Sequence, residues 1–232
     1  MTSSTWRALG NTYVVVEPED GPLDAARARV LARGTDGVLE VLARSADTVE
    51  IAIWNPDGSR AELSGNGTRI AAAWLAERTG ASDVSVVVAG RVVRSHLQAS
   101  GEIEQEIGAV VVGPGETVEG ITFVPVSVGN PHAVVVGDPA RIGIVGPALE
   151  THPRFPERTN VQVVRVDSPG EVTARVWERG VGETLSSGTS AVAVAAATHG
   201  DGEIVVHFPG GDLRVRLERG HATLYGTADR VS

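Results

Sequence analysis

Two serines occupy matched positions in a segment that the chain of 232 residues contains twice. The first copy covers residues 53–67 and the second covers residues 176–190, and the two align without a gap. Ser64 of the first copy corresponds to Ser187 of the second, 123 residues later (187 − 64). Each serine directly precedes a predicted helix, whose unpaired N–H groups and positive dipole end bind anions such as carboxylates. The repeat therefore predicts two anion-binding helix starts, each carrying a hydroxyl.

Two hydroxyls on opposite sides of one bound molecule suit a particular reaction. Inversion at a Cα atom needs one group that removes the proton and a second that returns a proton from the far face. Gly65 and Gly188 follow the serines, and their missing side chains let a ligand approach the backbone closely. Serine is also a preferred helix N-cap, which by itself explains either Ser64 or Ser187. The ungapped repetition over fifteen positions favours a functional role.

The elements that must position these serines form two similar halves facing each other. Strand-like runs at residues 49–54 and 172–177 lead into the two turns, and helices are predicted at residues 67–79 and 190–199. The second helix has almost no polar side chain, so we expect it to be buried inside its own sheet.

We place the two halves at residues 1–112 and 113–232, with the segment 110–119 around Gly113-Pro114-Gly115 as the linker. The expected fold is α+β. Each of the two pseudo-symmetric halves is expected to be a mainly antiparallel, barrel-like sheet around a central buried helix.

Composition and charge exclude several classes of protein. The net charge of −9 and the pI near 5.2 argue against nucleic-acid binding, which needs a basic face. No run approaches the roughly 20 apolar residues of a membrane span, and the N-terminus lacks a secretory signal, so we expect a cytoplasmic protein. The chain has no cysteine and its six histidines are scattered, so we expect no metal site.

A series of motifs, in the same order along nearly the whole chain, resembles the diaminopimelate epimerases. The motifs are LGN (9–11), NPDGS (55–59), SGNGTR (64–69), GNPH (129–132), RFPERTN (154–160), ERGVGET (178–184) and SGT (187–189). The resemblance implies a cofactor-independent amino-acid epimerase of two pseudo-symmetric halves that converts LL- to meso-diaminopimelate, a precursor of lysine and peptidoglycan. It also implies a small amino-acid substrate as the partner, and a homodimer.

The resemblance assigns roles to individual residues. In that family the two turn positions are cysteines, which act as a thiol and a thiolate on the Cα proton, and here Ser64 and Ser187 stand there. His132 and Glu178 match neighbours that help to set the protonation of the catalytic pair. The implied substrate-binding residues are Asn11, Asn55, Gly65, Asn66, Asn130, Asn160, Glu178, Arg179, Gly188 and Thr189. Gly37 stands where the family has a glutamine that contacts the substrate.

The serines leave three functions open, because a thiol has a pKa of about 8.5 and a serine hydroxyl is useful only beside a base. The first is a natural epimerase whose serines are activated by His132, Glu178 and the helix dipoles. The second is a relative that binds an amino acid and is catalytically impaired or inactive. The third is an isomerase of the phenazine-biosynthesis type that uses carboxylates, with Glu62, Glu178 or Glu183 as the base.

Overall fold

The computed structural model describes residues 2–17, 19 and 21–232, which form two compact units. Unit 1 contains Met1–Glu106 and Tyr225–Ser232, and unit 2 contains Ile107–Leu224. The chain therefore divides after Glu106 and not at the expected boundary between residues 112 and 113, and residues 225–232 return to unit 1. The return follows from strand pairing, because the short strand β19 (Asp229–Arg230) pairs with β1 (Thr2–Ala8).

The segment expected to be a linker carries two short strands instead. β9 (Val111–Val112) and β10 (Glu116–Val118) both pair with β11 (Ile121–Ser127). Between them, the N–H of Gly113 donates to the carbonyl of Pro125 at 2.8 Å. The Gly-Pro-Gly sequence therefore interrupts a strand without detaching the backbone from the sheet.

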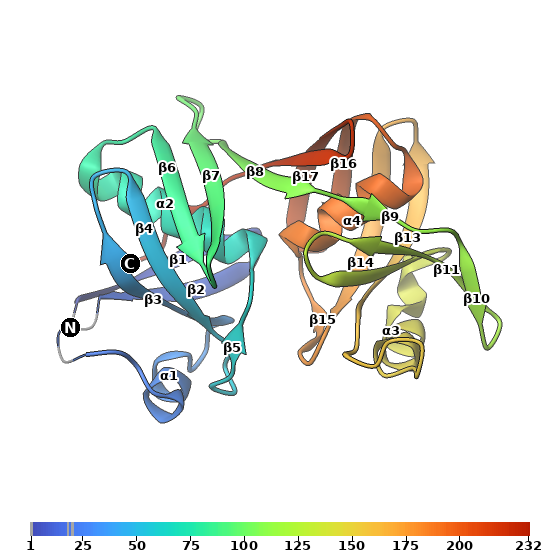
Figure 1. Cartoon of the computed structure of the whole chain (residues 1–232), viewed down its shortest axis with the longest axis horizontal. Coiled ribbons are helices and arrows are strands. Elements are labelled where there is room, and N and C mark those ends of the chain that lie inside the picture. Colours follow the sequence, from blue (N-terminus) through green and yellow to red (C-terminus); the bar gives the residue numbers. More distant parts are fainter. Residues whose placement is uncertain (1, 18, 20) are drawn as a thin grey trace. The chain divides into compact units, whose positions relative to one another are not determined.

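Unit 1 is a sheet built around one helix (Figure 1). Its elements are β1, β2 (Asn11–Glu17), α1 (Ala25–Leu31), β3 (Gly37–Arg44), β4 (Thr48–Trp54), β5 (Arg60–Ala61), α2 (Gly65–Thr79), β6 (Asp83–Val88), β7 (Arg91–Leu97), β19 and β8 (Ile103–Ala109), which runs on into unit 2. The pairs β2–β3 and β4–β6 are parallel, whereas β1–β2, β3–β4, β6–β7 and β7–β8 are antiparallel. α2 packs against β1, β2, β4, β6 and β7.

Unit 2 repeats this order of pairing. Its elements are β9, β10, β11, β12 (Pro131–Val136), the 3₁₀ turn η1 (Pro139–Arg141), α3 (Ile142–Glu150), β13 (Asn160–Ser168), β14 (Glu171–Glu178), β15 (Gly182–Thr184), α4 (Gly188–Thr198), β16 (Gly202–Phe208), β17 (Gly211–Glu218) and β18 (His221–Gly226), which runs on into unit 1. β12–β13 and β14–β16 are parallel, and β13–β14 and β16–β17 are antiparallel. This agreement with unit 1 confirms the expected α+β fold of two pseudo-symmetric halves.

The two central helices begin two residues before their predicted starts, at Gly65 and Gly188. The preceding serines have extended backbone angles, as N-cap residues do. α2 ends at Gly80, which adopts the left-handed conformation (φ 76°) that glycine tolerates best. The first eight residues of α4 are all buried, as its lack of polar side chains predicts. None of the helices in the described ranges is long and apolar enough to cross a membrane.

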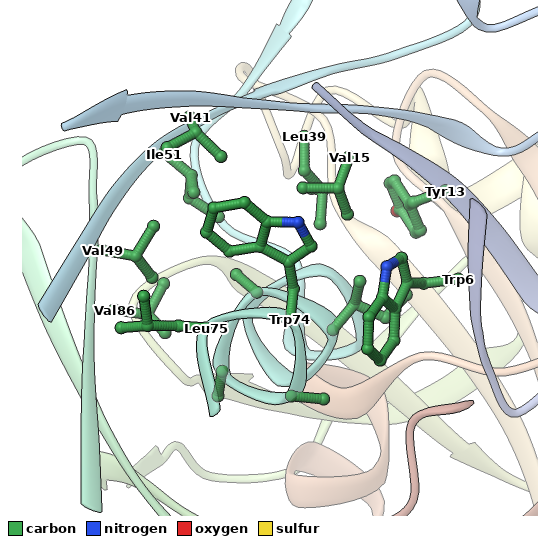
Figure 2. Close-up of a cluster of buried hydrophobic side chains, with 14 of the residues drawn as sticks. Trp6, Tyr13, Val15, Leu39, Val41, Val49, Ile51, Trp74, Leu75 and Val86 are labelled. Carbon is green, nitrogen blue, oxygen red and sulfur yellow. The ribbon is translucent and has the colours of Figure 1, made fainter. Parts of the chain in front are cut away.

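The core of unit 1 is organised around Trp74. This residue is 1% exposed, and its indole points from α2 into a layer of branched side chains on the strands, among them Leu39, Val41 and Ile51 (Figure 2). The guanidinium of Arg78 lies over the Trp74 ring, 4.2 Å from its centre. Trp74 is thus the largest of several side chains of α2, with Ile70 and Leu75 among the others, that pack this helix against the sheet.

Candidate active site

Ser64 lies between β5 and α2 and caps the helix. Its Oγ accepts a hydrogen bond from the N–H of Gly67 at 3.0 Å. The phenolic oxygen of Tyr13 lies 3.3 Å from the same Oγ, and either hydroxyl can be the donor. The capping explanation for Ser64 is therefore confirmed, but the hydroxyl also has a second, titratable partner.

A chain of polar side chains continues beside the start of α2. Asn66 donates from Nδ2 to Oδ1 of Asn11 at 2.5 Å, and its own Oδ1 accepts a hydrogen bond from Arg69. Arg69 is fully buried and also donates from Nε to the carbonyl of Thr227 at 3.1 Å. Its Nη1 has no hydrogen-bond partner among the described residues. Arg69 thus fixes which way the Asn66 amide points, and Asn66 in turn orients Asn11.

Asn55 lies in the tight turn after β4. Its Nδ2 donates to Oγ of Ser59 at 2.9 Å, and its backbone N–H donates to the carbonyl of Ser59. Just before it, the indole of Trp54 donates to Glu40, a carboxylate with no solvent exposure, at 2.8 Å. A buried glutamate therefore anchors the strand end from which Asn55 projects.

The space at Gly37 is already filled. A Cβ atom there would lie 2.5 Å from the carbonyl oxygen of Trp54 and 2.9 Å from Cε1 of Tyr13. A glutamine at this position, which the family resemblance implies, therefore cannot be introduced without moving its neighbours. We expect Gly37→Gln to destabilise unit 1 by at least about 1–3 kcal/mol, the usual cost of overpacking, and urea unfolding measures this. Gly137→Gln is the control, because a Cβ atom at Gly137 meets nothing within 4 Å and Gly137 does not have a positive φ; equal losses in both variants would contradict the steric explanation.

Ser187 caps α4 by its backbone position but not by its side chain. Its Oγ makes no capping hydrogen bond, and the residue is 7% exposed. Gly188 and Thr189 begin the helix, where the first N–H groups have no partner within the helix. The two serines thus differ. The Ser64 hydroxyl is hydrogen-bonded to the N–H of Gly67 and to the phenol of Tyr13, whereas the Ser187 hydroxyl makes no capping hydrogen bond.

His132 is held in a buried network beside the start of α4. Nε2 of Gln162 lies 3.0 Å from Nδ1 of the ring, and Nε2 of the ring lies 2.9 Å from Oδ1 of Asn130. Because the amide of Gln162 donates, the ring carries its proton on Nε2 and donates to Asn130. Asn130 then donates to Thr189 at 3.4 Å. Both ring nitrogens are used in this way, so His132 acts on Asn130 and not directly on Ser187.

Burial lowers the pKa of His132 to about 3, and the charge of Arg179 adds to the effect, while the hydrogen bond from Gln162 opposes it. An unfolded histidine titrates near pH 6.5, so between these values the unfolded chain binds more protons. The free energy of unfolding should therefore fall as the pH falls below about 6.5, by about 2 kcal/mol at pH 5. Urea unfolding of the wild type and of His132→Gln, at pH 5 and at a pH well above 6.5, measures this. The difference should vanish in His132→Gln and persist in the control His207→Gln; a wild-type difference shared by His132→Gln would contradict the assignment.

The remaining predicted residues of unit 2 surround the end of β14. Asn160 donates from Nδ2 to the carbonyl of Pro131 at 2.9 Å, and its Oδ1 accepts from the backbone N–H of Arg179 at 3.0 Å. Glu178 accepts a hydrogen bond from Thr184 at 2.6 Å. The contact with the N–H of Arg179 places Asn160, at the start of β13, beside Arg179, which directly follows Glu178 at the end of β14.

Glu150 fixes the same turn from α3. Its two carboxylate oxygens accept from the backbone N–H of Gly180 at 2.7 Å and from the indole of Trp177 at 2.8 Å. Trp177 is the repeat partner of Trp54, so both units use a buried glutamate to hold the tryptophan next to the site. The glutamates themselves come from different elements, α3 in one unit and β3 in the other.

Sequence reasoning missed several polar residues of the site: Tyr13, Arg69, Gln162, Glu40 and Glu150. Tyr13 had a signal, because it follows Asn11 by two residues as His132 follows Asn130 by two. Glu40 and Glu150 had none, since they lie at unrelated positions of the two halves. Among the residues that the structure describes, no group of three acidic, histidine or cysteine side chains could hold a metal ion. Of the carboxylates considered as bases, Glu183 is already paired with Arg175 at 2.5 Å.

Comparison with known proteins finds relatives that match nearly the whole chain. The family model for diaminopimelate epimerase matches residues 6–113 and 124–231. The chain is 35% identical to diaminopimelate epimerase 2 of Nostoc sp., over 92% of the chain and 87% of that protein. It is 34% identical to the diaminopimelate epimerase of Pelotomaculum thermopropionicum, over 96% and 94% respectively.

Solved structures share the fold at much lower identity. A predicted epimerase from Pseudomonas aeruginosa matches with a TM-score of 0.74 and 16% identity, covering 99% of the chain and 96% of that protein. A hydroxyproline epimerase from Agrobacterium vitis matches with a TM-score of 0.71 and 16% identity, covering 99% and 89%. A phenazine biosynthesis protein of the PhzF family from Bacillus anthracis matches with a TM-score of 0.74 and 14% identity, covering 99% of the chain and 96% of that protein. The fold is thus shared by proteins with different names, whereas the family model and the relatives at 34–35% identity are specific: the chain belongs to the diaminopimelate epimerase family.

Proposed function

We propose that the chain is an amino-acid epimerase that interconverts LL- and meso-diaminopimelate by proton transfer at Cα, without a cofactor. The observation that carries the proposal is the pair of serine-glycine helix starts, one in each unit, each flanked by amide side chains. Two observations support the choice of substrate. The relatives from Nostoc sp. and Pelotomaculum thermopropionicum are named diaminopimelate epimerases, and both halves of the chain match one family model.

In the proposed reaction Ser64 and Ser187 exchange protons with opposite faces of the substrate Cα. The backbone N–H groups at the two helix starts, from Gly65, Asn66, Gly188 and Thr189, bind the α-carboxylate. The other groups of the substrate contact Asn11, Asn55, Asn130, Asn160, Glu178 and Arg179. Arg179 suits the distal carboxylate of diaminopimelate, since a guanidinium pairs well with a carboxylate. His132 stays neutral and holds Asn130 in place.

A second candidate is a protein that binds the amino acid but turns it over poorly. The observation in its favour is the Ser187 hydroxyl, which has no capping hydrogen bond, in a position where the family uses a thiol. Both candidates share the substrate, and they differ only in whether the Cα proton exchanges.

The test is incubation with LL-diaminopimelate in D₂O, with NMR to follow both binding and the loss of the Cα proton. Exchange together with formation of the meso isomer supports the epimerase. Binding without exchange supports the second candidate. If LL-diaminopimelate neither binds nor exchanges, both are wrong. Arg179→Gln is a useful companion, because loss of the distal contact should weaken binding of diaminopimelate.

The family resemblance also leads us to propose a cytoplasmic homodimer that supplies a lysine and peptidoglycan precursor. Sedimentation velocity measures the assembly directly. A monomer at concentrations where the chain is active would contradict that part of the proposal.

A further inference from the structure

Tyr13 and Asn11 leave β2 on the same face, because side chains two residues apart in a strand point the same way. Asn11 contacts Asn66, and Tyr13 contacts Ser64. Two side chains of β2 therefore contact neighbouring residues at the start of α2. Tyr13 is 8% exposed and lies at the margin of the Trp74 core (Figure 2). Its ring occupies the space beside Gly37, 2.9 Å from where a Cβ atom would be. A residue without a side chain at position 37 therefore makes room for the phenol.

The hydrogen bonds of Ser64 define what its hydroxyl can do. A serine oxygen has one proton to donate and two lone pairs that accept. One lone pair accepts from the N–H of Gly67. If the Tyr13 phenol donates to the second lone pair, the proton of Ser64 points away from both Gly67 and Tyr13 and is available to a substrate. If Tyr13 is a phenolate, it accepts the proton of Ser64, and the serine oxygen can then take up another proton.

We propose that Tyr13 is a further catalytic residue, which exchanges a proton with Ser64 Oγ while Ser64 exchanges one with the substrate Cα. This inference rests on the proposed epimerase function. It concerns unit 1 alone, since His132, the residue at the same spacing in unit 2, contacts Asn130 and Gln162.

The proton balance is simple in both directions. When Ser64 acts as the acid, its O–H bond breaks, a C–H bond forms at the Cα carbanion, the phenol proton moves to Ser64 Oγ, and Tyr13 becomes a phenolate. When it acts as the base, the Cα–H bond breaks and its electron pair stays on the substrate. Ser64 Oγ takes that proton and passes its own to the phenolate, which becomes a phenol. No oxidant, metal or other reactant is needed.

The phenol matters because acid and base catalysis is most effective when the pKa of the group lies near the working pH. A phenol ordinarily titrates near pH 10, whereas a serine hydroxyl titrates much higher. The transfer to Ser64 leaves the negative charge on the aromatic ring system and not on an alkoxide. Tyr13 therefore gives the serine a partner that a capping N–H group cannot provide.

The experiment compares Tyr13→Phe with Tyr225→Phe, which removes the hydroxyl of the only other tyrosine in the chain. Deuterium incorporation at Cα is followed between about pH 7 and pH 10.5, starting from LL- and from meso-diaminopimelate. We expect Tyr13→Phe to lose about 10²–10⁴-fold in exchange rate, the usual effect of removing an acid/base group, with unchanged substrate affinity. The pH dependence that the wild type owes to the phenol should disappear. Tyr225→Phe should keep the wild-type rate and profile.

A second pair of variants separates chemistry from folding. In a Ser64→Cys, Ser187→Cys background, Tyr13→Phe should cost little, because a thiol at a helix start ionises without the phenol. A large loss in that background would show a structural role and overturn the inference. So would a Tyr13→Phe chain that keeps the wild-type rate and pH profile. A wild type that does not exchange, while the cysteine variant does, would also overturn it and leave the epimerase site intact. If neither exchanges, the proposed function itself fails.

Discussion

Replacement of both serines by cysteine, Ser64→Cys with Ser187→Cys, should raise the rate of diaminopimelate epimerisation by about 10²–10⁴-fold. A free thiol has a pKa of about 8.5, and a helix N-terminus lowers it further. Both serines stand at such positions. NMR or a stereospecific coupled assay measures the rate from each isomer.

The single variants are the internal controls. Because one group removes a proton from Cα and the other returns a proton to it, both steps must be fast, and each single replacement should give much less than the double replacement. Ser64→Cys should also reduce stability by about 1 kcal/mol, since it weakens the N-cap, whereas Ser187→Cys should not, because that side chain makes no capping bond. A double variant that binds the substrate but turns it over no faster than wild type would contradict the acid/base assignment.

Trp74→Ala should lower the free energy of unfolding of unit 1 by about 3–5 kcal/mol. The side chain is 1% exposed and fills the space between α2 and the strands of unit 1 (Figure 2). Its removal leaves a cavity that neighbouring branched side chains fill only in part. Urea unfolding followed by circular dichroism gives the loss.

Trp74→Phe is the matched control, because it keeps an aromatic ring in the same layer and should cost clearly less than the alanine variant. The corresponding position in α4 is Ala197 (74 + 123 = 197), so unit 2 is held together without a tryptophan on its helix. Ala197→Gly should therefore cost only about 1 kcal/mol, the helix-propensity term. A Trp74→Ala loss of that small size would show that the indole is not central to the core.

The two repeated segments could be predicted from the sequence, because local helix preferences and tertiary packing favour the same structure there. Serine, glycine and an alanine-rich run each favour the start of a helix, and the burial of α4 confirms what its composition predicts. The boundary between the two units could not be predicted from the sequence. Gly113-Pro114-Gly115 has the composition of a linker, yet backbone hydrogen bonds hold it beside β11.

Sequence patterns give no sign of α3, because the helix contains Gly143, Gly146 and Pro147, which local propensities count against a helix. Packing overrides them. A Cβ atom at Gly146 would lie 2.7 Å from Cβ of Trp177, so only glycine lets the helix lie this close to β14. That approach is what brings Glu150 to the indole of Trp177 and the N–H of Gly180.

The site was predictable where a residue type repeats and not where the halves diverge. Asn11 and Asn130 follow a glycine in both halves, and the structure places each beside a helix start. The residues two positions later differ, Tyr13 in one half and His132 in the other, and their partners depend on strand pairing and on buried neighbours. Spacing alone does not say that the phenol reaches a serine while the imidazole reaches an asparagine.

The return of residues 225–232 to unit 1 has a consequence for synthesis on the ribosome. Unit 2 is one continuous stretch of 118 residues (224 − 106), whereas unit 1 needs a segment that is translated after it. At about 5–20 residues per second, the first 106 residues wait roughly 6–24 s for their last strand. During that time the outer edge of β1 near Trp6 lacks β19, and Arg69 lacks the carbonyl of Thr227. The nascent chain is thus expected to complete its second unit before its first.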